Sequence, residues 1–356
     1  MHAIGRLPVR RAVADRDREG ALTPRGLAVA ALLLAFAGAG GAAERDARFA
    51  FLGDIGSGDR GQKAVRDQLL ARAPPFVFLL GDNIDDQGSA LLIKDRFDDM
   101  YAQVMATGAS FHAALGNHDV QACRAADVDP LPPDANAYSW RAAGCDVEFH
   151  LSHRDFGYAD ARRYYSVLSD EGPEPLVEVF VLDSNTLRAR EGKLKVSRED
   201  TAQVDWLDQG LAASRARWKI VALHHPPQSP RGRGSFLGLG GHDREPGLEA
   251  QLGPLFRKHG VDAVFAGHNH FYARLVPRDG VRFFVSGGGG RVLYDMDKAP
   301  GYVAAAGKFH HFVYVRATES RFEYYAIDDT GRSRDAGHWA KGDATDTPAP
   351  AGALPP

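Results

Sequence analysis

The sequence contains few cysteines, no excess of positive charge and no apolar segment of membrane-spanning length. Two cysteines occur among 356 residues, and their spacing matches no cysteine zinc site. The formal net charge of -3 excludes the strongly basic surface of a nucleic-acid-binding protein. Apolar residues make up 44% of the chain and charged residues 25%, which is typical of a globular protein with a sizeable core. An anionic substrate would therefore have to be held by local contacts rather than by long-range attraction.

The N-terminal residues 1–43 are predicted to be a signal peptide or leader. An apolar stretch, Leu27 to Ala37, follows Arg25 and precedes the small residues Gly38 to Ala43. This order is typical of a secretory signal with its cleavage site, and the stretch is short for a transmembrane helix. We expect export to a periplasmic or extracellular compartment, with no stable membrane span once the leader is removed. Anchoring by an uncleaved leader is the alternative.

Export would decide the state of the two cysteines, Cys123 and Cys145. In an oxidising compartment a single pair of cysteines is expected to form a disulfide. In the chain-entropy model such a bridge stabilises by about 3 kcal/mol. Two unpaired thiols are the alternative.

Five short polar blocks each follow directly on a strongly apolar run. Short apolar runs bounded by Gly or Pro predict buried strands. In open α/β sheets the functional crevice lies outside the carboxyl ends of the strands. One such block alone would be ordinary turn chemistry, but five in order predict a common site. The blocks are Gly53-Asp54, Gly81-Asp82-Asn83, Gly116-Asn117-His118-Asp119, His224-His225-Pro226 and Gly267-His268-Asn269-His270.

The polar residues of these blocks form a ligand set for two divalent or trivalent metal ions. Carboxylate, carboxamide and imidazole groups are the ligands that such metals prefer. A carboxylate can bridge two cations, and a pair of metals is typical of phosphoryl chemistry. One metal would be bound by Asp54, Asp82 and His270, and the other by Asp82, Asn117, His224 and His268.

The remaining residues of the blocks are candidates for catalysis. Hydroxide held by the metals would attack phosphorus in line. His118 is predicted to protonate the leaving oxygen or to hold a phosphate oxygen, with Asp119 orienting it. Asn83 and His225 are expected to support the ligands or to contact the substrate.

The pattern between the blocks predicts an α/β fold of two packed sheets with helices outside. Helical periodicity covers Gly61 to Arg72, Ser197 to Ser214 and Leu248 to His259, and its alternation with strands favours α/β. The later strands, Val281 to Ser286, Phe312 to Arg316 and Phe322 to Ile327, have little helix between them. We predict a catalytic domain over 44–335 with a loop-rich insertion at 121–175, and a disordered tail at 336–356.

The blocks together resemble the calcineurin-like metallophosphoesterase superfamily, and in particular its purple-acid-phosphatase-like branch. Arg163-Tyr164-Tyr165-Ser166, Val179 to Ser184 and Val285 to Gly290 also resemble that branch. The resemblance runs from Phe49 to about Ile327. It implies a four-layer α/β/β/α sandwich of two mixed sheets flanked by helices, and two metals drawn from iron, zinc and manganese. It also assigns the metal ligand of the fourth block to His224, with His225 as a neighbour.

Two positions depart from the family pattern at the first metal. Many superfamily members have Asp-x-His in the first block, whereas this chain has Gly56 at the third position. Purple acid phosphatases have a tyrosine three residues after the bridging aspartate, whereas this chain has Asp85. We hypothesise that Asp85, or otherwise Asp86, supplies the additional oxygen ligand, which suits manganese, zinc or ferrous iron. A weakly bound or empty first site completed by water is the alternative.

The resemblance and the ligand set predict a metal-dependent phosphoric ester hydrolase. The leading hypothesis is a secreted phosphatase that hydrolyses small phosphomonoesters. A phosphodiesterase with the same metal centre is the alternative, since two metals serve both reactions. A binding protein with a relict metal site is a third hypothesis, supported only by the histidine missing at Gly56.

Overall fold

Apolar runs of the sequence form two seven-stranded sheets in the computed structural model. It describes residues 44–84, 88–120, 147–158, 160, 162–187, 198–230, 232–233, 246–296, 301–350 and 352–356. All of them belong to one unit, Ala43–Pro356. The predicted leader, both cysteines and the residues Asp85 and Asp86 therefore lie outside the described residues.

The first sheet is mixed, with a parallel part and an antiparallel part. β1 (Asp46–Leu52) pairs in parallel with β2 (Phe76–Leu79), and β2 pairs in parallel with β3 (Ser110–Ala113). On its other side β1 pairs antiparallel with β13 (His311–Thr318). The antiparallel part continues through β14 (Arg321–Asp328), β15 (Ser333–Ala340) and β16 (Thr347–Pro348).

The second sheet is also mixed, with four parallel strands at its centre. β5 (Val177–Val181), β6 (Trp218–Leu223), β8 (Ala263–Ala266) and β10 (Arg282–Ser286) run parallel. Antiparallel strands complete both edges, namely β4 (Tyr165–Leu168), β9 (Tyr272–Leu275) and β12 (Val303–Gly307). A small ladder joins β7 (Gly232–Arg233) to β11 (Asp295–Met296).

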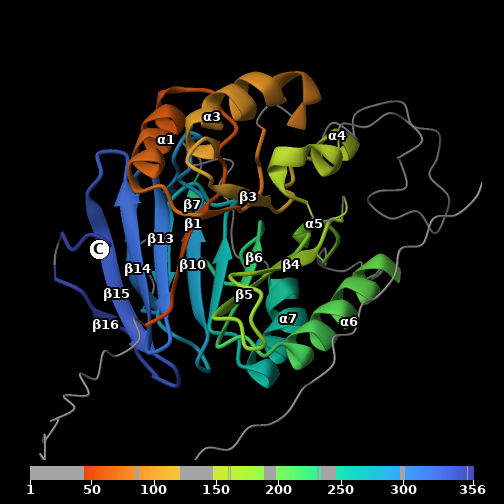
Figure 1. Cartoon of the computed structure of the whole chain (residues 1–356), viewed down its shortest axis with the longest axis vertical. Coiled ribbons are helices and arrows are strands. Elements are labelled where there is room, and N and C mark those ends of the chain that lie inside the picture. The colour runs from red at the N-terminus through yellow and green to blue at the C-terminus, as the bar shows by residue number, and fades with distance from the viewer. Residues whose placement is uncertain are drawn as a thin grey trace, which may run out of the picture. The chain divides into compact units, whose positions relative to one another are not determined.

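The two sheets pack face to face through aromatic side chains (Figure 1). The rings of Phe51 in β1 and Phe265 in β8 stack with centroids 4.0 Å apart, and Phe284 in β10 meets Tyr324 in β14 edge to face. Offset and edge-to-face pairs of this kind add stability beyond the area that they bury. The core therefore lies mainly between the sheets.

Helices cover the outer faces of both sheets, so the predicted four-layer sandwich is confirmed (Figure 1). α1 (Arg60–Arg72) lies against the first sheet, while α6 (Arg198–Ala213) and α7 (Pro246–His259) cover the second through Leu207, Leu252 and Phe256. These three match the predicted helices. The other helical segments are η1 (Ala90–Leu92), η2 (Lys94–Asp98), α3 (Asp99–Met105), α4 (Val147–Ser152), η5 (Arg154–Phe156) and α5 (Ser184–Leu187). Among the described residues no helix combines the length and the apolar character needed to cross a membrane.

The carboxyl ends of the parallel strands of both sheets meet at one edge of the sandwich. Hydrogen bonds between the strand-end segments show this directly. The Gly53 N–H donates to Ser286 O across the two sheets at 2.8 Å, and the Asp54 N–H donates to Gly81 O at 3.0 Å. All five predicted blocks begin at this edge, because each follows β1, β2, β3, β6 or β8.

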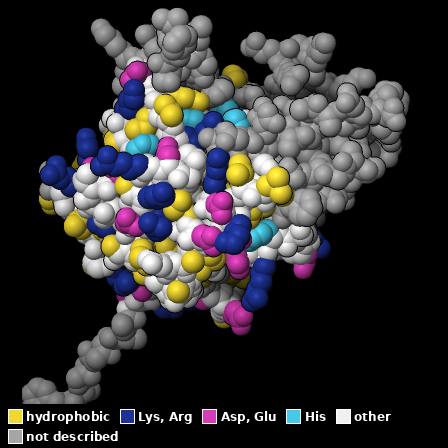
Figure 2. Space-filling model, turned by 90° about the horizontal axis from the view of Figure 1, so that it is seen from above, with side chains coloured by type: hydrophobic (Ala, Val, Ile, Leu, Met, Phe, Trp, Pro, Cys, Tyr) yellow, Lys and Arg dark blue, Asp and Glu magenta, His cyan; other side chains and the backbone are white. Residues whose placement is uncertain are grey.

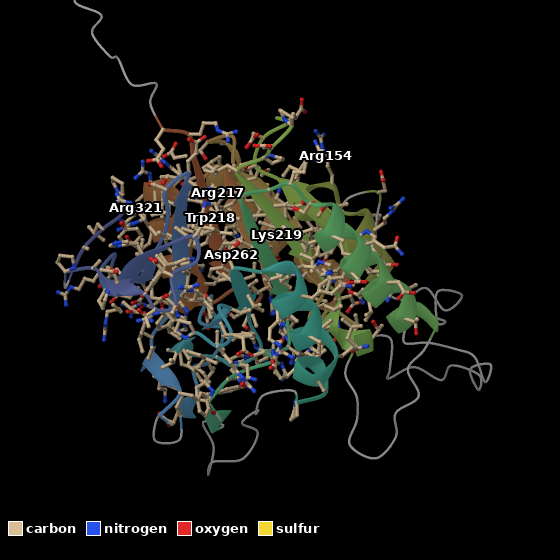
Figure 3. The ribbon with its side chains drawn as sticks, turned by 90° about the horizontal axis from the view of Figure 1, so that it is seen from below. Arg154, Arg217, Trp218, Lys219, Asp262 and Arg321 are labelled. Carbon is tan, nitrogen blue, oxygen red and sulfur yellow. The ribbon has the colours of Figure 1, made fainter. Side chains whose placement is uncertain are left out.

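Hydrogen bonds at the opposite edge of the sandwich join neighbouring strands and the two sheets. Trp218, Lys219 and Asp262 lie there, at the amino ends of β6 and β8 (Figure 3). The indole N–H of Trp218 donates to Thr318 O at 2.7 Å, joining the two sheets, and the Lys219 N–H donates to the Asp262 carboxylate at 2.9 Å. None of these residues belongs to the predicted site.

The prediction of a disordered tail at 336–356 is wrong for its first part. Residues up to Ala340 form β15, and Thr347–Pro348 form β16. Trp339 is fully buried and stacks on Phe322 at 4.4 Å. The composition of the tail resembles a loop, but the open edge of β14 provides the hydrogen-bond partners that a strand needs. The predicted insertion at 121–175 likewise contains α4, η5 and β4 within its described residues.

Candidate metal centre

The structure brings the six principal predicted ligands together. His224 Nε2 lies 3.0 Å from Asn117 Oδ1, 3.2 Å from His268 Nδ1 and 3.4 Å from Asp82 Oδ1. His270 Nε2 lies 3.2 Å from Asp54 Oδ1. Ligand atoms of Asp54, Asp82 and His224 all lie within 4.8 Å of one another, which joins the two groups into one cluster.

The orientation of the His224 ring directs one nitrogen at the other predicted ligands. Its Nδ1 lies 2.8 Å from the Leu80 carbonyl oxygen, and a carbonyl oxygen only accepts, so Nδ1 carries a proton. Nε2 then faces the oxygens of Asn117 and Asp82 and the His268 ring. Imidazole, carboxamide and carboxylate groups are together a donor set that suits a metal ion.

The same reasoning applies to His270. Its Nδ1 lies 2.8 Å from the Val292 carbonyl oxygen, so Nδ1 carries a proton and Nε2 faces Asp54 Oδ1. That oxygen is buried and has no hydrogen-bond partner among the described residues. Donor atoms that each lie about 2.1 Å from one ion are about 3 Å apart when they stand at right angles. The observed separations therefore fit a shared metal ion at each half of the cluster.

Three of the predicted ligands have strained backbone conformations. Asp54, Asp82 and His268 have φ angles of 60°, 52° and 69°, in the left-handed region. Such a conformation costs about 1–2 kcal/mol for a residue with a side chain, and residues of this kind concentrate at functional sites. In this conformation the backbone turns after the strand, and the side chain points into the cluster.

A close backbone approach explains the glycine of the third block. A Cβ atom at Gly116 would lie 2.1 Å from the Asp82 N and 2.2 Å from Asp82 Oδ1. No side chain fits there, so the second and third blocks come together only because residue 116 is glycine. This approach lets the His118 N–H donate to Asp82 Oδ1 at 2.8 Å.

Neighbouring charges and a hydrogen bond favour the ionised form of the Asp82 carboxylate. Burial alone would raise the pKa of Asp82, but the neighbouring His224 and His118 side chains and the His118 N–H outweigh it, so this pKa lies below its ordinary value. An ionised carboxylate between the two halves of the cluster is the group needed to bridge two cations.

Asp119 does not orient His118, so that part of the prediction is wrong. Its buried carboxylate accepts the N–H groups of Gly116, Asn83 and Ile84, and the side-chain amide of Asn83 at 3.0 Å. His118 Nδ1 has no hydrogen-bond partner among the described residues. Asp119 therefore links the second block to the third by hydrogen bonds, and Asn83 is its partner. Burial, and then the charge of Asp82, raise the pKa of Asp119 well above its ordinary value.

Asp119→Asn is expected to lower the free energy of unfolding by about 2–3 kcal/mol, because an amide NH2 would face N–H donors that are left without an acceptor. Chemical denaturation of the metal-free protein measures this loss. His118→Ala serves as the comparison, since the His118 side chain is partly exposed and its removal should leave stability nearly unchanged. Equal stability of the two variants would contradict the proposal that Asp119 links the second and third blocks.

His118 lies at the exposed side of the cluster. Its side chain is 26% exposed, and its Nε2 is 3.9 Å from Asp82 Oδ2. This distance is too long for a hydrogen bond, but it places the ring beside the bridging carboxylate, where a phosphate group would be bound. Figure 2 views this edge of the sandwich and shows histidine side chains close to Lys or Arg side chains.

His225 is a neighbour of the cluster, as expected. The ring nitrogens of His224, His225 and His268 lie within 4.8 Å of one another. His225 Nδ1 and its backbone N both pair with the Ser184 hydroxyl, at 2.8 Å and 3.0 Å. Ser184 follows β5, so a sixth strand end contributes to the site. The run Val179 to Ser184 was part of the family resemblance, but no ligand pattern pointed to the Ser184 contact.

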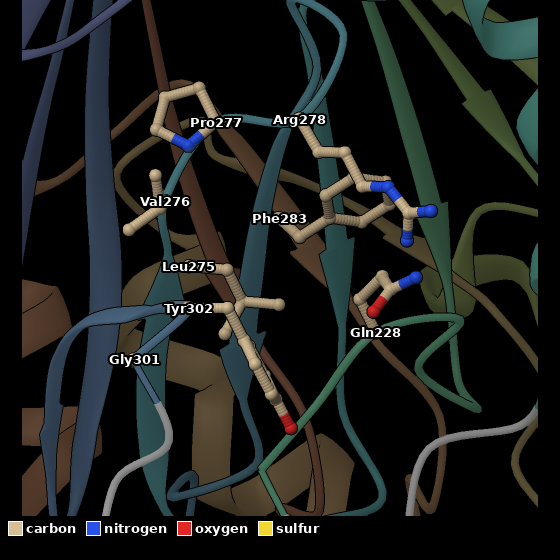
Figure 4. Close-up of a pocket in the computed structure, with 8 residues that line it drawn as sticks. All are labelled: Gln228, Leu275, Val276, Pro277, Arg278, Phe283, Gly301 and Tyr302. Carbon is tan, nitrogen blue, oxygen red and sulfur yellow. The ribbon is translucent and has the colours of Figure 1, made fainter.

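Asn269 connects the cluster to a separate pocket. It lies between the two histidines of the fifth block. The Asn269 amide donates to the Ser229 hydroxyl at 2.6 Å, and the Tyr302 hydroxyl donates to Ser229 O at 3.2 Å. Tyr302 lines a pocket of about 490 Å³ together with residues such as Leu275 and Phe283 (Figure 4). None of its described lining residues belongs to the predicted ligand set.

Comparison with known proteins agrees with this geometry. The model of the calcineurin-like phosphoesterase family matches residues 47–272, a range that holds all five blocks. The chain belongs to the calcineurin-like phosphoesterase family. This membership confirms the predicted resemblance.

The proteins similar to this chain include acid phosphatases. The chain is 24% identical to tartrate-resistant acid phosphatase type 5 of Sus scrofa, over 76% of this chain and 77% of that protein. It is 24% identical to purple acid phosphatase 17 of Arabidopsis thaliana, over 61% of this chain and 59% of that protein. A purple acid phosphatase from yellow lupin seeds has the same fold, with a TM-score of 0.61 at 18% identity, over 83% of this chain and 54% of that one. The chain thus spans little more than half of the latter two phosphatases.

Proposed function

We propose that this chain is a metal-dependent phosphatase that hydrolyses small phosphomonoesters. The observation that carries the proposal is the convergence of His224 Nε2, His270 Nε2 and the Asp54 and Asp82 carboxylates in one buried cluster. Family membership supports phosphoester hydrolysis, and the similarity to purple acid phosphatases supports a pair of metals.

The proposed ligands divide between two ions. Asp54, Asp82 and His270 would hold one, and Asp82, Asn117, His224 and His268 the other. We keep Asp85 as the additional ligand of the first ion. Iron, zinc and manganese all suit oxygen and imidazole donors. When bound, such ions lower the pKa of water toward neutrality and neutralise the charge of a phosphate group.

The residues of the chain then orient and protonate the substrate. His118 stands at the exposed side of Asp82, within reach of an ester bound there, and we assign to it the protonation of the leaving oxygen. Asp119 keeps His118 in place indirectly, because it ties the third block to the second. Asp54, Asp82 and His268 have left-handed conformations, which concentrate at functional sites where they contribute to preorganisation.

We further propose that the protein is exported by its leader, residues 1–43, and that Cys123 and Cys145 pair in the oxidising compartment. The composition of the leader supports export. The similarity to acid phosphatases is consistent with it. Mass spectrometry of the mature protein without reduction gives both the cleavage site and the disulfide.

Elemental analysis combined with a substrate panel tests the proposed activity. Protein dialysed against a chelator and reloaded with manganese, zinc or ferrous iron is expected to bind about two ions per chain and to hydrolyse 4-nitrophenyl phosphate. Bis(4-nitrophenyl) phosphate, a diester, should react more slowly. We expect no strong visible charge-transfer band, because Asp85 stands in place of the tyrosine of purple enzymes.

The panel separates the alternatives. Faster hydrolysis of the diester would identify a phosphodiesterase. Full metal loading without hydrolysis of either ester would favour a binding protein with a relict site. A strong charge-transfer band would exclude Asp85 as the ligand that replaces the phenolate.

A further inference from the structure

Arg291 lies at the metal cluster although no ligand pattern of the sequence includes it. It follows the glycine run at the end of β10, and its backbone N–H donates to Asp54 O at 3.0 Å. A Cβ atom at Gly287 would lie 2.2 Å from Asn269 O and 2.8 Å from Asp54 Oδ2. The glycine therefore lets this segment pack against the first and fifth blocks, which fixes the position of Arg291.

The Arg291 side chain extends to the bridging carboxylate from the solvent side. Its Nη1 lies 3.8 Å from Asp82 Oδ2. The Arg291 side chain is 20% exposed, whereas that of Asp82 is 2% exposed. The two groups attract each other electrostatically, but the distance is too long for a hydrogen bond. A guanidinium carries five N–H donors in a planar fork.

Two side chains from different loops thus flank the same oxygen of Asp82. Arg291 comes from the segment after β10, and His118, 3.9 Å from this oxygen, comes from the segment after β3. Both are partly exposed, so a ligand entering from solvent would meet them before it reached the buried ligands. The fork of N–H groups on arginine matches two oxygens of a phosphate group.

We propose that Arg291 binds the non-bridging oxygens of the substrate phosphate and thereby selects phosphomonoesters over phosphodiesters. This inference rests on the proposed phosphatase function. A monoester carries close to two negative charges at neutral pH and has three terminal oxygens, whereas a diester carries one charge and has two such oxygens. A fixed cation beside the metal centre therefore stabilises the bound monoester more strongly.

Arg291→Gln separates this role from a structural one. We expect kcat/KM for 4-nitrophenyl phosphate to fall by about 10- to 100-fold, as for loss of a charged hydrogen bond, while kcat/KM for bis(4-nitrophenyl) phosphate falls by less than about threefold. Binding of inorganic phosphate, measured by calorimetry on the metal-loaded protein, should weaken in parallel with the monoester. Arg291→Lys should recover part of both losses, because it keeps the charge but not the fork.

Arg278→Gln is the matched control, since Arg278 is 58% exposed and lies beyond β9, outside the metal cluster. Equal losses for both esters, unchanged kinetics for both, or a lower metal content in Arg291→Gln would each overturn the proposal. If the wild-type protein hydrolyses neither ester, the proposed phosphatase function fails. Phosphate calorimetry still decides the Arg291 contact, because unchanged phosphate binding in Arg291→Gln would overturn it.

Discussion

Asp82→Asn is expected to lower kcat/KM for 4-nitrophenyl phosphate by at least about a thousandfold. The buried Asp82 carboxylate connects the two halves of the cluster, since its ligand atoms lie within 4.8 Å of those of Asp54 and His224. Asparagine preserves the shape and an acceptor for the His118 N–H, but it removes the negative charge that would bridge two cations. We therefore also expect the metal content to fall by about one ion per chain.

Steady-state kinetics and elemental analysis of the same preparations measure both effects. Asp67→Asn is the matched control, because Asp67 is 61% exposed and pairs only with Arg66 on α1 among the contacts that the structure describes. Its kinetics and metal content should equal those of the wild type. If Asp82→Asn retained two ions and near-normal activity, Asp82 would not be the bridging ligand.

Trp339→Ala is expected to lower the free energy of unfolding by about 3–5 kcal/mol. Trp339 lies in β15, at the C-terminal side of the predicted catalytic domain, and is fully buried. Its ring stacks on Phe322 and lies 4.6 Å from the Arg282 guanidinium carbon. The side chain thereby joins the tail to both sheets, and its removal leaves a large cavity in the core.

Urea unfolding of both proteins measures this difference, provided that the slope with denaturant is unchanged. A chain ending at Pro348 is the control, because it keeps β15 and β16 and should be about as stable as the full chain. If Trp339→Ala left the free energy of unfolding unchanged, the tail would contribute nothing to the stability of the core, as the sequence composition alone suggests.

Much of the fold and of the cluster was predictable from local patterns. The apolar runs before Asp54, Asp82, Asn117, His224 and His268 determine strands, and parallel strands necessarily bring their carboxyl ends to the same edge. The order of apolar runs and polar blocks therefore predicted which blocks would meet, while the family resemblance selected His224 over His225 in the fourth block. The helices α1, α6 and α7 were equally predictable, since each shows an apolar face at helical period.

Other features depended on contacts between segments far apart in the chain. Asp119 resembled an orienting group for His118, yet it accepts N–H groups 35 and 36 residues away. Arg291 and Ser184 reach the cluster because both sheets deliver strand ends to one edge, and Trp339 is buried because β14 offers an open side. The sequence by itself determined the strands and the polar residues at their ends, because hydrophobic periodicity is a local property. Only the tertiary structure decided which buried donors, acceptors and charges surround those ligands, because hydrogen-bond partners follow from distance in space.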